Sequence, residues 1–360
     1  RPARTLPTLV LALVGVALGA LGCRSSEQRT ASAPPASVSV DPATHTLETI
    51  AFGSCARQSA DQPIWRSIAD REPHLYVALG DNIYGDTEDM DVMREKYARL
   101  AENPGFRALR ASTPMEAIWD DHDFGENDAG RYYPRRDASE DVFLEFWNVP
   151  DTSSRWDRPG IYGSTSYGPE GRRVQLILLD TRYFRDSLRT WPEGARPEGS
   201  GPYRPWDDPA KTLLGEAQWN WLARQLEKPA RIRILASSIQ VVSDRHGWEG
   251  WGNFPHERER LFRLIREKEA NGVIVLSGDR HAAEISRYDG AEVGYPVYDV
   301  TASALNQSGG APNETNPYRT HGRKYIEPNF GQIQVGWGQE DPPIRLQIRD
   351  VDGEVVREER

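Results

Sequence analysis

Short apolar runs alternate with amphipathic segments along most of the chain. The run at 75–79 is continuously apolar, as expected for a parallel strand that is buried on both faces. In other segments apolar residues recur at helical spacing, as Trp219, Leu222 and Leu226 do. This pattern predicts an α/β protein, with strands at 49–52, 75–79, 117–119, 174–179, 231–236, 273–276, 295–300, 331–335 and 344–348 and helices at 62–71, 88–101, 140–147, 215–226 and 255–270.

Two long segments show neither period. Residues 184–211 are rich in Pro, Gly, Arg and Trp, and residues 244–254 combine three aromatic residues with His246. Long stretches without secondary structure inside a compact domain are usually functional, so we expect both to be loops over one face. The last two strands alternate polar and apolar residues, which is typical of an antiparallel edge. Because the composition does not change after residue 47, we expect a single domain over 47–360.

The N-terminal segment does not fit the globular pattern. Arg1 and Arg4 precede an uncharged stretch at 5–22 whose centre is apolar, and Ala20-Leu21-Gly22-Cys23 resembles a lipobox. We therefore expect a signal peptide over 1–22, lipidation of Cys23, and a disordered tether over 23–46 that is rich in Ser, Ala and Pro. This would anchor the domain in the cell envelope, on the outer membrane or on a periplasmic or extracellular face. The alternative is an ordinary signal peptide with an incidental cysteine.

The net charge of −10 argues against a nucleic-acid-binding surface. Bound cations would neutralise part of this charge, although an acidic soluble surface explains most of it. The two cysteines, Cys23 and Cys55, are too few for a disulfide framework.

Four apolar runs end in side chains that bind metals. Residues 119–128 contain five carboxylates, a histidine and an asparagine, and carboxylate oxygens are the ligands that hard cations prefer. The other three runs end in Cys55, in Asp81 with Tyr84, and in Asp279 with His281. Ligand sites collect at the carboxyl ends of parallel strands, so we expect the four ends to meet at one multinuclear metal site. Taken singly, a buried tyrosine, a core cysteine or a turn aspartate is equally compatible with packing.

The series of motifs resembles that of a known family. The segments 52–55 (FGSC), 80–84 (GDNIY), 119–123 (WDDHD), 179–182 (LDTR) and 277–281 (SGDRH) are similar to the motifs of the alkaline phosphatase D (PhoD-like) family, a branch of the calcineurin-like metallophosphoesterases. The resemblance extends over about 47–335. It implies a four-layer α/β/β/α sandwich that hydrolyses phosphate monoesters or diesters with Fe³⁺ and one or two Ca²⁺ ions, or with other divalent metals.

The resemblance also implies roles for individual residues. A trivalent ion would take Cys55, Asp81, Tyr84 and His281, with Asp81 bridging to a second ion. That second ion would also take Asp121 and Asp279. Further candidates are Asp123 as a calcium ligand and Asn127 as a ligand of calcium or of the phosphate. His122 would protonate the leaving alcohol, and Arg182 and Arg280 are candidate phosphate clamps.

One expected ligand is missing. Members of the wider superfamily have a histidine at the end of the strand that here runs into 237–240, where this chain has Ser-Ser-Ile-Gln. Gln240, His246 or a water molecule are the alternatives for that position.

The resulting hypothesis is a secreted or lipid-anchored phosphoester hydrolase, expected to be a monomer, in which a hydroxide activated by the metal ions attacks phosphorus. The first alternative is a phosphodiesterase or an enzyme of phospholipase D type. The second is a non-catalytic, calcium-binding surface lipoprotein whose acidic clusters are structural.

Overall fold

The computed structural model describes residues 37–310 and 314–360, which belong to one compact unit. The predicted signal peptide, Cys23 and most of the predicted tether lie outside the described residues. Within the described part, no helix has both the length and the apolar character needed to cross a membrane.

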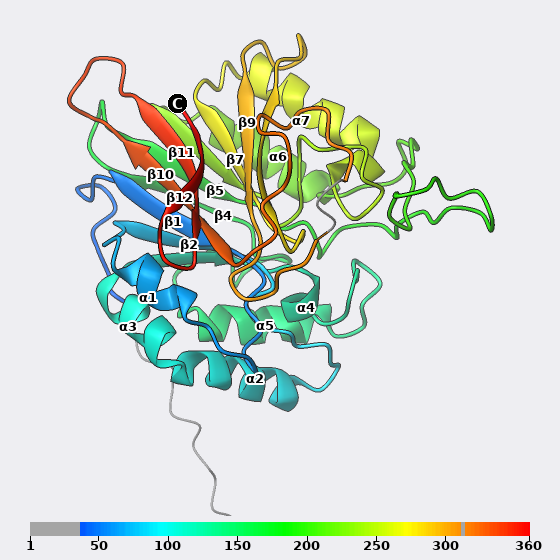
Figure 1. Ribbon diagram of the computed structural model, residues 1–360, viewed down its shortest axis with the longest axis horizontal. Helices are drawn as coiled ribbons and strands as arrows, with labels where there is room; N and C mark the ends of the chain where they lie inside the picture. The colour runs from blue at the N-terminus through cyan, green and yellow to red at the C-terminus, as the bar shows by residue number, and fades with distance from the viewer. Residues whose placement is uncertain (1–36, 311–313) are drawn as a thin grey trace, which may run out of the picture. The chain divides into compact units, whose positions relative to one another are not determined.

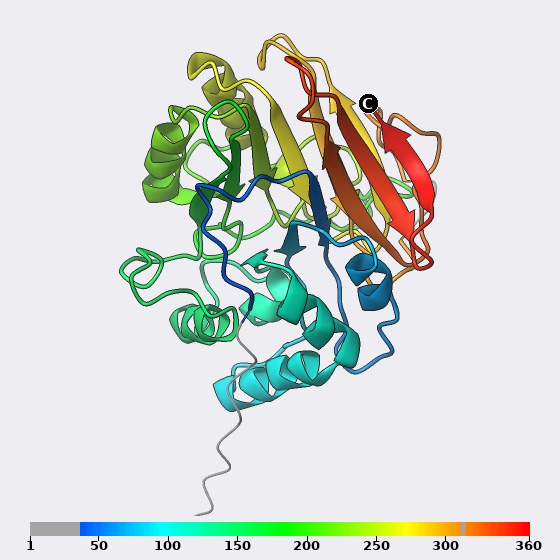
Figure 2. The ribbon, with the colours of Figure 1, turned by 90° about the vertical axis from the view of Figure 1, so that its left-hand side faces the viewer.

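The architecture is built on two six-stranded sheets (Figure 1). The first sheet has the order β12 (Val355–Glu359), β11 (Ile344–Asp350), β10 (Asn329–Val335), β1 (Thr49–Gly53), β2 (Leu75–Leu79) and β3 (Met115–Ile118). The second has the order β4 (Gly163–Tyr167), β5 (Val174–Leu178), β6 (Ile232–Ala236), β7 (Val273–Ser277), β9 (Val297–Ala302) and β8 (Ala283–Tyr288). Strands β1 to β3 are parallel to one another, as are β5, β6, β7 and β9. Figure 2 shows the C-terminal strands lying beside the N-terminal β1, with which β10 pairs antiparallel.

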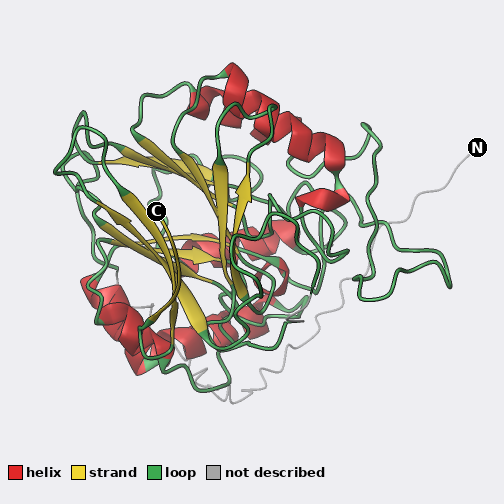
Figure 3. Cartoon of the chain, turned by 45° about the horizontal axis from the view of Figure 1, so that its top comes forward, coloured by secondary structure: helices red, strands yellow, loops and turns green. Residues whose placement is uncertain are grey.

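Helices cover the outer face of each sheet, which gives the α/β/β/α layering (Figure 3). Next to the first sheet lie α1 (Ile64–Ala69), α2 (Met90–Glu102), α3 (Pro104–Ser112), the one-turn helix α4 (Asp121–Phe124) and α5 (Arg136–Phe146). The second sheet packs against α6 (Gly215–Leu226) and α7 (Pro255–Glu267), with a short 3₁₀ turn at Trp251–Asn253.

The side chains of β5 show how the layers are held together. Val174, Leu176 and Leu178 belong to the core shared with the first sheet, whereas Ile177 and the following Leu179 belong to the core under α6 and α7. Since neighbouring residues of a strand point to opposite faces, a continuous apolar run is required when both faces are buried. The prediction of a strand buried on both faces was made for 75–79, and it is confirmed because every residue of β2 is buried.

The α/β class and each predicted strand and helix are confirmed, with boundaries shifted by up to four residues. Helices α3 and α4 and strands β4, β8 and β12 were not predicted. The edge prediction was wrong in one respect: β10 and β11 do pair antiparallel, but β12 lies outside β11 and forms the edge.

Candidate metal centre

The four predicted strand ends come together. Cys55 follows β1, Asp81 follows β2, Asp121 follows β3 and Asp279 follows β7. Among the described residues, donor atoms form four groups in which all atoms lie within 4.8 Å of one another: Cys55, Asp81 and His281; Asp81, Asp121 and His122; Asp120, Asp121 and Asp279; and Asp121, Asp128 and Glu249. Asp81 is shared by two groups and Asp121 by three, so the groups form one continuous cluster.

Tyr84 lies at the edge of this cluster. Its hydroxyl is 3.0 Å from Nε2 of His281, and the Sγ atom of Cys55 is 3.4 Å from Oδ2 of Asp81. The backbone of Tyr84 is held on both sides by Gln58, which accepts from its N–H at 2.9 Å and donates to its carbonyl at 3.3 Å. A thiol, a phenol, an imidazole and the carboxylate of Asp81 thus lie close together.

The backbone turns sharply at these donors. Cys55, Asp81, Asp279 and His281 have φ angles of 62°, 49°, 67° and 50°, in the left-handed region that side chains with a Cβ rarely adopt. Each such residue costs on the order of 1 to 3 kcal/mol and persists only when its surroundings impose it. The four donors therefore occupy costly conformations that aim their side chains at a common point.

Two glycines explain the repeated Gly-Asp pairs of the sequence. A Cβ on Gly80, whose φ is +97°, would lie 2.6 Å from the backbone nitrogen of Asp120. A Cβ on Gly278 would lie 2.5 Å from Oγ of Ser54. Only glycine lets the ends of β2 and β7 approach their neighbours this closely.

The cluster is buried and acidic. Burial raises the pKa of the Cys55 thiol to about 12, and burial together with Cys55 and Asp121 raises the pKa of Asp81 well above its usual value. For Asp121 the effect of burial is outweighed by the charges of Arg182 and His122, which bring its pKa to about 2. Ligands of this kind bind cations in their deprotonated form, so cations are the natural counterpart that would displace the protons of Cys55 and Asp81. The residues present fit a cluster of hard cations.

His122 stands at the open side of the cluster. Its side chain is 17% exposed, and Nδ1 lies 2.6 Å from Oδ1 of Asp86. Its ring packs against that of Tyr84 with a centroid separation of 4.3 Å. Burial lowers the pKa of His122, but the hydrogen bond to Asp86 and the charges of Asp121 and Asp86 outweigh this and raise it above its usual value.

The two arginines predicted as phosphate clamps are both engaged by carboxylates. Arg182 is fully buried and pairs with Asp120 and with Glu249, the latter at 2.6 Å. Arg280 pairs with Glu314 at 2.5 Å and with Asp279 at 3.5 Å. In this geometry each guanidinium group holds an acid of the site, Asp120 for Arg182 and Asp279 for Arg280, and contact of either arginine with phosphate stays a prediction.

Two predicted calcium ligands lie outside the four donor groups. The carboxylate of Asp123 accepts the backbone N–H groups of Asp120, Asp81 and Asn82 at 2.6, 3.1 and 3.3 Å, so its oxygens are used to hold the two strand ends together. Asn127 is exposed. These hydrogen bonds give Asp123 a structural role, and the binding of calcium by Asp123 or Asn127 stays a prediction.

The alternatives for the missing histidine stay predictions. The side-chain amide of Gln240 donates to Glu284 and Thr301, and its Oε1 has no hydrogen-bond partner among the described residues. His246 accepts from the backbone N–H of Trp248 and belongs to none of the donor groups. The sequence analysis did not assign Asp120, Asp128 or Glu249, which the structure adds to the cluster. The sequence did contain an indication for Glu249, because it is the one carboxylate between the tryptophans Trp248 and Trp251.

Comparisons with known proteins agree with this geometry. The model of the PhoD-like phosphatase family matches residues 50–348. Alkaline phosphatase D of Bacillus subtilis (strain 168) is 26% identical over 276 residues, which are 65% of this chain and 46% of that protein, so the chain spans about half the length of this curated relative.

Two solved structures show the same fold. A structure of PhoD superposes with a TM-score of 0.67 at 19% identity, covering 89% of this chain and 73% of the other. The purple acid phosphatase PPD1 from yellow lupin (Lupinus luteus) seeds superposes with a TM-score of 0.58 at 13% identity, covering 89% and 54%. The fold is that of the metallophosphoesterases, and the family match extends over most of the sequence. This chain belongs to the family of PhoD-like phosphatases.

Proposed function

We propose that the protein hydrolyses phosphate esters by means of a cluster of two or more cations. The observation that carries the proposal is the continuity of the donor groups: Asp81 and Asp121 are shared between groups, and His122 stands beside them at the open side. Shared carboxylates are what two neighbouring cations require, and paired cations are suited to the displacement of an alcohol from phosphate.

We assign Cys55, Asp81, Tyr84 and His281 to a trivalent ion, because a thiolate and a phenolate are strongly donating, anionic ligands. Asp81, Asp121 and Asp279 would hold a second, harder ion, and Fe³⁺ with Ca²⁺ is the pair that this donor set favours. When bound, the ions supply charge neutralisation on the phosphate oxygens and activation of water at neutral pH.

The role of His122 is to hold a proton for the leaving alcohol. Asp86 fixes the ring through Nδ1, which leaves Nε2 as the atom that carries the transferable proton. The hydrogen bond to Asp86 raises the pKa of His122, which favours the protonated imidazole that a general acid requires.

Arg57 is a further guanidinium that we propose contacts the substrate. It is exposed, and its guanidinium carbon lies 4.3 Å from the centre of the Tyr84 ring. Its backbone is fixed by Asn306, which accepts from the Arg57 N–H at 2.7 Å and donates to its carbonyl at 3.0 Å. No ion pair of its guanidinium is found within 37–310 and 314–360. A planar guanidinium placed beside the cluster can donate two N–H groups to two oxygens of a phosphate.

Elemental analysis combined with an ester panel tests the proposal. We expect about one iron and one or two calcium ions per chain, release of nitrophenol from a nitrophenyl monoester or bis-ester, and loss of activity with chelator. Faster release from the bis-ester would favour the phosphodiesterase alternative. A protein that binds calcium alone and hydrolyses neither ester would instead be a calcium-binding surface module, and the proposal would be wrong.

We also propose that the domain is held at the cell envelope through a lipid on Cys23. The support is the lipobox-like sequence 20–23 at the end of an apolar stretch. Fatty-acid labelling of cells that express the wild type or Cys23→Ser tests this: label confined to the wild type is expected, and an unlabelled wild type contradicts it.

A further inference from the structure

A cavity of about 240 Å³ lies between the two long loops 184–211 and 244–254. Its walls include the aromatic side chains of Trp191, Tyr203 and Trp248 together with Asp244 and His246. Aromatic walls with a few converging polar groups are characteristic of pockets for small organic groups.

The two loops form one wall because their backbones are hydrogen-bonded to each other. The N–H of Gly201 donates to the carbonyl of His246, and that of Tyr203 to the carbonyl of Gly247, both at 2.8 Å. A third bond of 2.8 Å runs from the N–H of Trp206 to the carbonyl of Asn253. The cavity is therefore formed before any ligand arrives, which reduces the entropy that binding would otherwise cost.

Two contacts connect the cavity to the metal centre. The hydroxyl of Tyr203 donates to Oδ2 of Asp128, which shares a donor group with Asp121. On another side, the ring of Trp248 covers the guanidinium of Arg280 at 5.6 Å, and Arg280 pairs with Asp279. Two residues of the cavity wall thus touch residues that belong to, or pair with, the donors of the cluster.

The cavity contains a buried donor with no partner. Nδ1 of His246 accepts from the N–H of Trp248 at 3.0 Å, so in the neutral ring the proton is on Nε2. Burial and the charges of Arg280 and Lys324 lower the pKa of His246 well below its usual value, which keeps the ring neutral. His246 is only 3% exposed, and its Nε2 has no hydrogen-bond partner among the described residues.

The space in front of this donor is kept open by Gly250. A Cβ at that position would lie 3.3 Å from Nε2 of His246. The Nε1 of Trp191 and the Oδ1 of Asp244 also have no hydrogen-bond partner within the described part of the chain. Two N–H donors and one carboxylate oxygen are thus available to a ligand, and a buried polar group without a partner costs free energy until a ligand supplies one.

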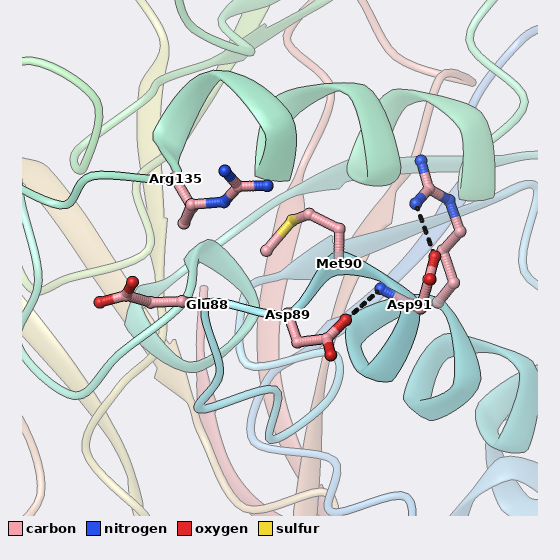
Figure 4. Close-up of a pocket in the computed structure, with 6 residues that line it drawn as sticks. Glu88, Asp89, Met90, Asp91 and Arg135 are labelled. Carbon is pink, nitrogen blue, oxygen red and sulfur yellow. Dashed lines mark hydrogen bonds and ion pairs between the residues drawn. The ribbon is translucent and has the colours of Figure 1, made fainter.

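A second hollow provides a contrast. Figure 4 shows a surface depression at the start of α2, lined by Glu88, Asp89, Met90, Asp91, Arg94 and Arg135. Its polar groups already have structural roles, because Asp89 caps α2 and Arg94 pairs with Asp91. None of its lining residues is a donor of the metal centre.

We propose that the cavity between the two long loops is the subsite for the alcohol part of the substrate, and that it takes a single polar ring bearing hydrogen-bond acceptors. A sugar and a nucleobase share this chemistry, since either can stack on tryptophan and accept from Trp191 and His246. The inference rests on the proposed phosphoesterase function and narrows its substrates to esters of ring-bearing alcohols.

The test compares esters that differ only in the alcohol. Phosphate release is measured from a hexose 1-phosphate, from a nucleoside 5′-monophosphate and from acyclic glycerol 1-phosphate. Gly250→Ala, which covers Nε2 of His246, and Trp191→Ala, which removes a wall, are expected to raise KM for the preferred ring ester about tenfold and to leave KM for glycerol phosphate and the metal content unchanged. The preferred ring ester identifies the source of the ring.

Trp206→Ala is the matched control, because Trp206 lies in the same loop but does not line the cavity. Equal effects of the three substitutions, or equal effects on cyclic and acyclic esters, would overturn the proposal. Calorimetric titration with a methyl glucoside or uridine tests the subsite separately from the proposed ester hydrolysis, because neither compound carries a phosphate. Binding that is lost in Gly250→Ala supports the subsite even if no ester is hydrolysed, and no binding of either compound by a protein that does hydrolyse esters contradicts it.

Discussion

Asp121 and Asp180 are two buried acids, one just past a strand of each sheet, that differ in the hydrogen bonds they accept. Both are buried and both follow a parallel strand, β3 in one sheet and β5 in the other. The carboxylate of Asp180 accepts four N–H groups at 2.9 to 3.0 Å, from Trp119, Ile161, Arg182 and Tyr183. That of Asp121 accepts two, from His122 and Asp128.

The difference shows that a carboxylate near the end of a strand is not necessarily a metal ligand. A carboxylate offers about four lone-pair directions, and Asp180 has used them on the protein itself. Asp121 retains unused ones and lies beside other acids. The supply of N–H groups around a buried acid thus separates a structural aspartate from a candidate ligand.

The largest expected effects come from exchanging each of the two aspartates for asparagine. Asp121→Asn is expected to lower ester hydrolysis about 1000-fold or more and to reduce the bound divalent metal, because the shared ligand loses its charge. Asp180→Asn is expected to destabilise the fold by about 2 to 4 kcal/mol, because its amide N–H₂ would meet N–H donors. Metal analysis and urea unfolding of both variants check this. If Asp180→Asn loses metal at unchanged stability, the comparison fails.

A smaller effect is expected at the histidine beside Asp121. His122→Ala is expected to lower turnover by about 100-fold to 10 000-fold, because the leaving alcohol loses its proton donor. Asp86→Asn is expected to lower it by about 10-fold to 100-fold and to shift the basic limb of the pH–rate profile to lower pH, since Asp86 raises the pKa of His122. Metal content should match the wild type in both variants. Unchanged turnover in His122→Ala would remove it from the mechanism.

The smallest expected effect concerns a buried acid outside the metal centre and tests whether its surroundings decide its charge there too. Glu140 on α5 is buried, and the N–H of Gly160 donates to it at 3.0 Å. Burial raises its pKa from 4.5 to about 8, so the folded protein retains a proton that the unfolded chain releases. The stability that this proton provides is fully present below pH 4.5 and is lost as the pH rises through about 8.

The measurement is urea unfolding between pH 5 and 9. The wild type should lose on the order of 1 to 3 kcal/mol over this range relative to Glu140→Gln, whose side chain does not titrate. Parallel pH profiles of the two proteins would show that burial does not raise the pKa of Glu140, which would contradict the prediction.

The sequence predicted the parts of the molecule that depend on local pattern. Doubly buried strands such as β2 and β5 are recognisable because both faces require apolar side chains. The polar strand β4, with the sequence GSTSY, is not, because tertiary pairing rather than propensity forms it. For α3 a signal was overlooked, since the Asn103 side chain caps a helix whose first residue is Pro104.

The centre itself was predictable only in outline. The convergence of Cys55, Asp81, Asp121 and His281 follows from strand order and is supported by the donor groups. Whether Asp121 or Asp123 faces a cation depends on which backbone N–H groups surround each of them, and this information is not local in sequence. Asp128 and Glu249 enter through loops, whose path the hydrophobic pattern does not encode.

The left-handed backbone at Cys55, Asp81, Asp279 and His281 lowers the stability that the protein has before it binds metal ions. Together these conformations cost on the order of 4 to 12 kcal/mol, which is comparable to the entire net stability of a typical domain. Cations that bind only the native arrangement would offset this cost. We therefore expect that newly made chains in metal-starved cells are degraded by proteases and do not accumulate as an inactive reserve.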